Sequence, residues 1–334
     1  MPVRPCITTK RMDNLKNVDV NFFPAWTRKS LTFTIDDGNV KWDRIFLDIV
    51  RPAGILGTFN LCSHLTSALT PEGYRDFYRG YEISNHVKYH PSTLTDGESY
   101  EIRDGFDPMS SLESPAGHNI LYKTDVDGIY KYRRPGAAAR PGGWWIKALA
   151  DDYIEFVKAG KRELEQIFGE GSIRGFVWPG MRQNNSAVIS YLKTCAEYYG
   201  LRKTGEILDT TRFSMPSDRM EWTYNATAPT LLSCMEKYDL LEDDGELKFF
   251  SFGVHSGDFE TYGKWDDLRE FASKYGNRPD DYYYASVGDI FAYEDATKKI
   301  KITDTEIQNP TDITLYVKVN GKKIALSPKS SLKI

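Results

Sequence analysis

The stretch Leu-Thr-Phe-Thr-Ile-Asp-Asp-Gly at residues 31–38 decides the fold we expect for this chain. Residues 31–35 favour a buried β-strand, the carboxylates of Asp36 and Asp37 follow where it stops, and Gly38 permits an immediate turn. In a barrel of alternating strands and helices, the loops at the carboxyl ends of the strands carry the chemistry. Two adjacent carboxylates repel each other unless a cation or a proton is shared between them. The stretch therefore predicts a strand that ends at a metal site.

The chain on either side alternates between strand and helix patterns. Further strands are expected at residues 55–61, 81–84, 173–178, 247–254 and 282–287. Helices are expected at residues 42–49, 71–78, 144–168, 187–199, 265–275 and 287–293. Strands and helices at this short spacing are typical of a parallel sheet or barrel in an α/β protein.

Three parts of the chain fall outside this rhythm. Residues 1–29 are expected to be an irregular lead-in, and residues 91–143 an inserted loop rich in Gly, Pro, Ser and Asp. The inserted loop is either a binding element, whose tyrosines and arginines contact a polar ring-shaped ligand, or a solvated surface excursion. Residues 297–334 alternate apolar and polar side chains around Asn320-Gly321, which predicts a small β appendage with a hairpin. The central domain would then span residues 30–296.

Composition sets limits on the class of protein. With 334 residues, 40% of them hydrophobic, the chain can bury a large core. The net charge of -4 gives no basic surface for nucleic acid or an anionic membrane, and the sequence does not indicate an oligomeric state. No apolar run is long enough for a signal peptide or a membrane span, so we expect a cytoplasmic protein, or a secreted one whose signal was removed. The four scattered cysteines, without CxxC spacing, are expected to be mostly buried thiols.

A second group of candidate ligands is the pair His86 and His90, which is followed by Pro91. Two imidazoles four residues apart can converge on one ion. Pro91 favours an extended backbone at His90, so the pair is expected at a turn or a helix end. Most histidines at this spacing make ordinary hydrogen bonds, and the metal hypothesis therefore depends on the two aspartates upstream. His255, at the end of a later strand, adds a third histidine to the same predicted edge.

Together these motifs resemble the polysaccharide deacetylase family, that is, carbohydrate esterase family 4 with the NodB homology domain. The family's TFDDG motif is similar to residues 34–38, and its HxxxH motif followed by Pro is similar to residues 86–91. Its Arg-containing third motif resembles residues 174–180, its fourth resembles residues 218–222, and its last, a strand ending in His, resembles His255. The motifs follow the family's order over roughly residues 30–293.

The resemblance implies a distorted (β/α)7 barrel of the NodB type and a metal-dependent deacetylase that acts on N-acetylated carbohydrate. The resemblance implies that Asp37, His86 and His90 bind a divalent ion, zinc or another divalent metal. Asp36 would be the general base towards a water molecule, and protonated His255 would give a proton to the leaving amine. The implied partner is a carbohydrate substrate.

The remaining site residues are supporting ones. By resemblance, Arg174 would orient Asp36, and Asp218 would hold His255 as an imidazolium. The alternatives are a surface ion pair for Arg174 and a turn or helix cap for Asp218. Substrate-binding candidates are Tyr89, Trp178, Pro179 and Trp222. For the two tryptophans, a place in the core or the pocket wall is the alternative.

Other functions are compatible with the same residues. The barrel could hydrolyse a formamide, a cyclic amide or the acetate of xylan with unchanged metal ligands. A catalytically silent carbohydrate-binding relative is a second alternative, although binding alone needs neither Asp36 nor His255. A two-metal phosphatase or nuclease is a third, but it needs more carboxylates than these motifs offer.

Overall fold

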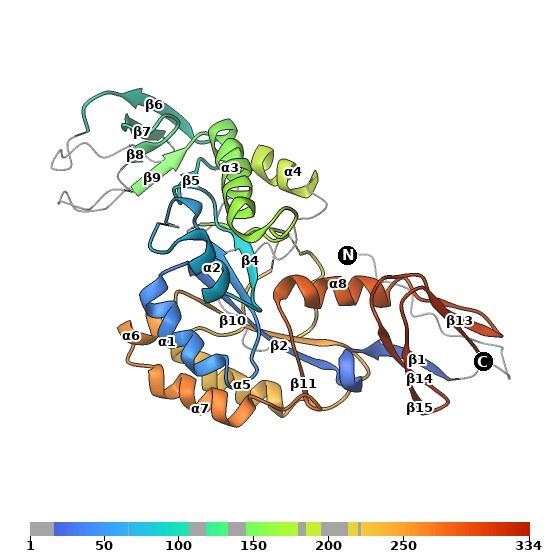
Figure 1. Cartoon of the computed structure of the whole chain (residues 1–334). Helices are drawn as coiled ribbons and strands as arrows, with labels where there is room; N and C mark the ends of the chain where they lie inside the picture. Colours follow the sequence, from blue (N-terminus) through green and yellow to red (C-terminus); the bar gives the residue numbers. More distant parts are fainter. Residues whose placement is uncertain are drawn as a thin grey trace.

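A parallel β-sheet forms the centre of the protein. The computed structural model describes residues 17–65, 67–106, 118–132, 145–179, 185–194, 213–219 and 222–334. Strands β10 (Lys248–Val254), β2 (Lys29–Asp37), β3 (Thr58–Leu61) and β4 (Glu82–Asn85) lie side by side in this order, all parallel. Strand β11 (Tyr282–Tyr284) pairs with the first residues of β2 (Figure 1). The expected parallel sheet of an α/β protein is thus confirmed.

Two single bridges extend this sheet at its edges. Phe176 pairs in parallel with Asn85 beyond β4, and Ala226 pairs in parallel with Phe252 beyond β10. Within the described residues, no pairing joins the Phe176 segment to the Ala226 segment. The structure therefore shows seven parallel segments, but not a closed seven-stranded barrel.

Helices cover the outer face of the sheet, as Figure 1 shows for α1, α5, α6 and α7. The helices are α1 (Val40–Val50), α2 (Pro71–Phe77), α3 (Ala150–Phe168), α4 (Ser186–Thr194), α5 (Leu231–Asp239), α6 (Asp258–Thr261), α7 (Trp265–Tyr275) and α8 (Val287–Thr297). Of these and the shorter 3-10 turns in the described ranges, none has the length and apolar character needed to cross a membrane.

Aromatic side chains between sheet and helices fix the strand positions. Phe33 of β2 and Phe46 of α1 are fully buried, with ring centroids 4.9 Å apart. Phe59 of β3 and Phe252 of β10 join the same cluster. Because side chains alternate along a strand, burial of Phe33 and Ile35 on this face turns Thr34 and Asp36 to the inner face. Each buried ring contributes about 1.5–3 kcal/mol, so the strand ends that carry the site rest on a rigid core.

The segment expected as an inserted loop at residues 91–143 contains most of a second sheet. Its strand order is β5-β9-β8-β7-β6, with both parallel and antiparallel neighbours. The strands are β5 (Ser92–Thr93), β6 (Ser99–Arg103), β7 (His118–Lys123), β8 (Tyr130–Tyr132) and β9 (Trp145–Ala148). The prediction of a loop was wrong here because these strands are short and separated by polar turns, so hydrophobic periodicity does not reveal them. Because residues 145–148 pair as β9, the helix that was expected to begin at residue 144 begins at Ala150.

The C-terminal region forms two small antiparallel sheets. Its strands are β12 (Lys301–Ile302), β13 (Glu306–Asn309), β14 (Leu315–Val319), β15 (Lys322–Leu326) and β16 (Ser330–Lys333). The hairpin predicted at Asn320-Gly321 is confirmed between β14 and β15. Both turn residues have positive φ angles, 50° and 80°, as a type I′ turn requires.

Strand β1 (Val18–Phe22) lies in the part of the chain that was expected to be irregular. It pairs with β14 and thereby ties the start of the described chain to the C-terminal region. The five-residue alternation of Val18, Val20 and Phe22 is too short to predict a strand alone. Its partner comes from the other end of the sequence, which local patterns do not reveal.

Candidate active site

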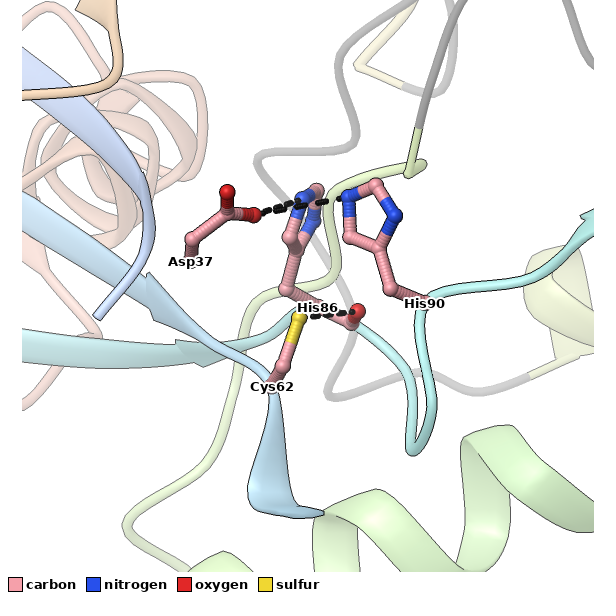
Figure 2. A group of neighbouring side chains, drawn as sticks. All are labelled: Asp37, Cys62, His86 and His90. Atoms are coloured by element: carbon pink, nitrogen blue, oxygen red, sulfur yellow. Dashed lines mark hydrogen bonds and ion pairs between the residues drawn. The ribbon is translucent and has the colours of Figure 1, made fainter. Parts of the chain in front are cut away.

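The candidate site lies at the carboxyl ends of three neighbouring strands. Asp37 ends β2, Cys62 follows β3, and His86 follows β4 directly. Because these strands are adjacent and parallel, the three side chains reach the same edge of the sheet. His90 returns to this group after a turn, and Figure 2 shows the four side chains together. The structure thus brings Asp37, His86 and His90 together at this edge, and their role as metal ligands stays a prediction.

The backbone at the end of β2 brings both aspartates to one site. Successive residues of a strand point to opposite faces, so Asp36 and Asp37 would normally diverge. Asp37 instead has a φ of 75°, and Gly38 has a φ of 78°. A Cβ atom at Gly38 would lie 2.6 Å from Cδ2 of Leu61, so the turn requires glycine for space as well as for conformation.

Three potential metal donors face one another without hydrogen bonds between them. Oδ1 of Asp37 lies 3.5 Å from Nε2 of His86 and 3.4 Å from Nε2 of His90. This oxygen is buried and accepts no hydrogen bond within the described part of the chain. An orphaned buried carboxylate oxygen is costly. A divalent ion with nitrogen and oxygen ligands would satisfy all three atoms, so the donor set fits a metal.

The orientation of His86 supports this fit. Nδ1 of His86 lies 2.9 Å from the backbone carbonyl oxygen of Val177, to which an Nδ1–H group donates. That tautomer leaves the lone pair of Nε2 directed at Asp37. Burial also lowers the pKa of His86, which keeps the ring neutral and able to act as a ligand.

His90 reaches the site through a strained turn. The two histidines lie outside regular helix and strand, so the predicted turn is confirmed. However, the φ angle of His90 is 58°, so the extended conformation expected before Pro91 was wrong. Val87 and Tyr89 also have positive φ angles, and Tyr89 N donates to Nδ1 of His64 at 3.0 Å. Such strain typically persists where the surroundings hold a functional group in place.

Asp36 lies on the inner face beside the three donors. Its Oδ1 accepts a hydrogen bond of 2.7 Å from Nδ2 of Asn60, and its Oδ2 lies 4.0 Å from Nε2 of His86. The residue is 6% exposed, so the carboxylate is largely shielded from solvent. Asn60 occupies β3, two residues before Cys62, and was not selected from the sequence. The role of Asp36 as a base stays a prediction.

His255 approaches the site from β10. Its Nε2 lies 3.5 Å from Oδ2 of Asp37, and its Nδ1 lies 3.3 Å from Oδ2 of Asp258. The hydrogen bond with Asp258 is the largest cause that raises the pKa of His255, to about 9. Among the described residues, Asp37 and Asp258 form ion pairs with His255, and the charge of Asp36 also raises its pKa. Asp218, the expected partner, is not one of them, and the prediction missed Asp258 because it lies outside the motif.

Arg174 contacts the first residue of β4, at the end of the strand away from the candidate site. Its guanidinium donates to Oε1 of Glu82 at 3.0 Å and to Oδ1 of Asp289 at 2.9 Å. Glu82 is the first residue of β4, whereas Asp36 aligns with the third residue through β3. These contacts of Arg174 are with Glu82 and Asp289, and its role towards Asp36 stays a prediction. They resemble the ion-pair alternative, with Glu82 as a largely buried partner.

The predicted substrate-binding residues differ in exposure. Trp178 is 4% exposed and packs on Tyr153 and Phe176, and Trp222 is 5% exposed and packs on Phe249. Both indoles therefore belong to hydrophobic packing, as the core alternative states. Tyr89 is partly exposed and its ring lies 5.5 Å from that of His64. Pro179 is buried beside Trp178 in sequence.

A buried carboxyl group, that of Asp43, contacts the residue that follows His255. Asp43 on α1 accepts hydrogen bonds of 2.6 Å from Ser256 Oγ and from Tyr78 Oη. It is fully buried, and this burial raises its pKa to about 7. Asp43 therefore links α1 to the residue that follows His255.

Cys62 is a possible metal ligand that sequence reasoning missed. The thiol was expected to be buried, and both Cys62 and Cys234 are. Cys6 and Cys195 lie outside the described residues. The available signal was that Cys62 directly follows a strand. This signal points to the site only once the strand order is known, because β3 lies between β2 and β4.

Comparisons with known proteins give structural neighbours only. No model of a protein family matches the sequence, and no curated protein does either. A family 4 acetyl xylan esterase from Clostridium thermocellum, solved with a cobalt ion, is 13% identical with a TM-score of 0.43, covering 80% of this chain and 92% of the esterase. The chain resembles carbohydrate esterases of family 4.

Two further solved structures are of the same kind. A peptidoglycan deacetylase from Bacillus subtilis is 13% identical with a TM-score of 0.40, over 81% of this chain and 95% of the deacetylase. An esterase of family 4 from Streptococcus mutans is 13% identical with a TM-score of 0.42, over 78% of this chain and 86% of the esterase.

Proposed function

We propose that this protein is a metal-dependent hydrolase that removes N-acetyl groups from an amino-sugar-containing carbohydrate. One observation carries the proposal: a buried oxygen of Asp37, without a hydrogen bond in the described structure, faces the Nε2 atoms of both His86 and His90. A carboxylate and two imidazoles are a set typical of a catalytic zinc site. Asp37, His86 and His90 would hold the ion.

The residues around these ligands supply the proton transfers. A bound divalent ion lowers the pKa of a coordinated water and polarises a carbonyl group. Asp36, held by Asn60, would accept the proton of the attacking water. His255, held by Asp258, would donate a proton to the leaving nitrogen of the acetamide. The two groups approach from β2 and β10, which lie next to each other.

The exposure of the site favours a large substrate. The side chains of His90 and His255 are 38% and 49% exposed, whereas those of Asp36 and His86 are buried. A sugar unit can therefore reach the open rim while the acetyl group meets the buried base. The motif order supports an N-acetyl sugar, and an acetyl ester of xylan, a formamide or a cyclic amide remains the alternative substrate for the same residues.

The seven parallel segments would form a distorted barrel of the NodB type. Residues 30–296 would be the catalytic unit, with the inserted sheet as part of it. Residues 297–334 would be a packing appendage that holds β1.

Metal content and acetate release test the proposal. We expect about one zinc ion per chain, lost in His86→Ala and retained in Asp36→Asn. Asp36→Asn should lose about 10²–10⁴-fold in turnover, the usual contribution of a general base. Acetate release would be measured from N-acetylglucosamine oligomers and from acetylated xylan with the same preparation.

The outcomes separate the alternatives. Acetate from the amino sugar alone supports deacetylation, and acetate from xylan alone shifts the proposal to the ester. A full complement of metal without turnover on either substrate would favour the silent carbohydrate-binding protein. Absence of any tightly held ion under zinc loading would contradict the hydrolase.

A further inference from the structure

Cys62 occupies a distinctive place in the sheet. It follows β3 directly, and β3 lies between β2, which carries Asp37, and β4, which precedes His86. Side chains alternate along a strand, so Thr58 and Asn60 of β3 form one row, and Cys62 follows one residue past the end of the strand. Asn60 in that row contacts the carboxylate of Asp36 on the inner face. The thiol of Cys62 therefore lies next to the candidate site.

The thiol is close enough to the other donors to share an ion with them. One donor atom from each of Asp37, Cys62, His86 and His90 lies within 4.8 Å of the other three. Figure 2 shows the sulfur beneath His86, next to its backbone carbonyl oxygen, at 3.4 Å. That thiol hydrogen bond is weak and can be exchanged for a stronger interaction. Cys62 is completely buried, so no water competes for the sulfur.

A second observation points to a ligand at this place. Oδ1 of Asp37 is buried without a hydrogen bond in the described chain, and it lies beside two imidazole nitrogens. Asp37 therefore offers an unsatisfied buried oxygen to a cation, independently of the thiol. Sulfur, two nitrogens and one oxygen around that point form a four-donor set suited to a borderline or soft metal ion.

We propose that Cys62 is a fourth protein ligand of the ion, which would then be bound by one thiolate, two imidazoles and one carboxylate, with a fifth position left for the water of the proposed reaction. This inference rests on the metal site of the proposed function. On binding, a bond forms between the sulfur and the metal, and the thiol proton passes to solvent. Thiolate ligation selects Zn²⁺, Co²⁺ or Cd²⁺ over Mg²⁺ and Mn²⁺, which prefer oxygen ligands.

Cobalt substitution of the full chain tests the thiolate directly. Co²⁺ in a protein site gives visible d–d bands, and a bound thiolate adds an intense sulfur-to-cobalt charge-transfer band in the near ultraviolet. We expect both in the wild-type protein. The charge-transfer band should vanish in Cys62→Ser and persist in Cys234→Ser, a matched change of a second buried cysteine on α5.

Metal affinity gives a second readout. Cys62→Ser should lose about 10-fold or more in Cd²⁺ affinity, since even the loss of a residue that only hydrogen-bonds to a metal ligand has an effect of this size. Its Mn²⁺ affinity should stay within about 3-fold of the wild-type value. If Cys62→Ser fails to fold, Cys62→Ala takes its place, and absence of the charge-transfer band from the wild-type protein still overturns the ligation. The spectra need no substrate, so they do not depend on which acetylated compound is hydrolysed.

The outcomes distinguish the two proposals. Visible bands without a charge-transfer band in the wild-type protein would overturn ligation by Cys62 and leave the Asp37, His86 and His90 site intact. A charge-transfer band that survives in Cys62→Ser would also overturn it. No bound cobalt by equilibrium dialysis would overturn the metal site of the proposed function, and the ligation by Cys62 with it.

Discussion

Oδ2 of Asp258 lies 3.3 Å from Nδ1 of His255 and also accepts a hydrogen bond of 3.2 Å from the backbone N–H of His255. One carboxylate thus fixes both the ring and the backbone of the same histidine. The contact is made within one turn of chain, since Asp258 begins α6 directly after the end of β10. Any proton transfer by His255 therefore depends on a neighbour in sequence.

Asp258→Asn should impair catalysis far more than Asp218→Asn. The amide cannot stabilise a positively charged ring, so we expect kcat to fall by about 10²-fold with little change in KM. Asp218→Asn should leave kcat within roughly 2-fold. Steady-state kinetics of acetate release measures both values. Equal losses, or a larger loss in Asp218→Asn, would contradict the position of Asp258.

Arg174→Gln should reduce stability without reducing turnover. Glu82 is largely buried, and it also accepts hydrogen bonds from Thr58 Oγ1 and the Gly288 N–H, so loss of Arg174 removes its cationic partner. We expect the free energy of unfolding to fall by about 1–3 kcal/mol. Urea unfolding and kcat would be measured on the same samples.

An exposed ion pair gives the control for Arg174. Arg79 pairs with Asp76, and both side chains are well exposed. Arg79→Gln should therefore cost only about 0–1 kcal/mol. A large loss of turnover in Arg174→Gln at unchanged stability would support the predicted role of Arg174 towards Asp36.

Asp43 should make the stability fall as the pH rises from about 4 to about 7, with no further fall above that. Its pKa is raised to about 7 in the folded protein, so the folded state binds this proton more tightly than the unfolded chain. Between about pH 4 and pH 7 the group therefore opposes folding increasingly, by up to about 1.4 kcal/mol per unit of pH. Asp43→Asn removes this effect, so its stability relative to the wild type should improve as the pH rises.

Urea unfolding at several pH values from roughly 5 to 8 measures that difference. Asp48→Asn, at an exposed position on the same helix α1, is the matched control and should show no such trend. A difference between Asp43→Asn and wild type that stays constant over this range would show that the buried carboxyl is not titrating there.

Gly38→Ala should cost more than Gly80→Ala. Both glycines have positive φ angles, 78° and 88°, so each alanine carries a conformational penalty of about 1–2 kcal/mol. Only at Gly38 would the added carbon meet another atom, Cδ2 of the buried Leu61, at 2.6 Å. Overpacking there adds about 1–3 kcal/mol, and a displaced Asp37 should also weaken metal binding.

Thermal unfolding and metal titration of both alanine variants check this prediction. Gly80 has open space around it, so Gly80→Ala reports the conformational penalty alone. Equal destabilisation of the two variants, with unchanged metal affinity in Gly38→Ala, would show that the contact with Leu61 relaxes without cost.

The sequence by itself determined the local parts of this protein. A β-favouring run that ends in Asp36, Asp37 and Gly38 specifies a strand end with paired charge, because each feature acts within a few residues. The histidine turn before Pro91 and the hairpin at Asn320-Gly321 were predictable for the same reason. Their positions along the chain also predicted that Asp37, His86 and His90 share one edge.

Tertiary structure decided which residues surround that edge. Cys62 became a candidate ligand only because β3 lies between β2 and β4, an order that no local pattern encodes. Likewise, the C-terminal strand β14 gives β1 its partner. Asp258, not Asp218, faces His255 because α6 begins in the turn after β10. Strand order and turn geometry are set by packing of the whole core, and they fix the neighbours of the site.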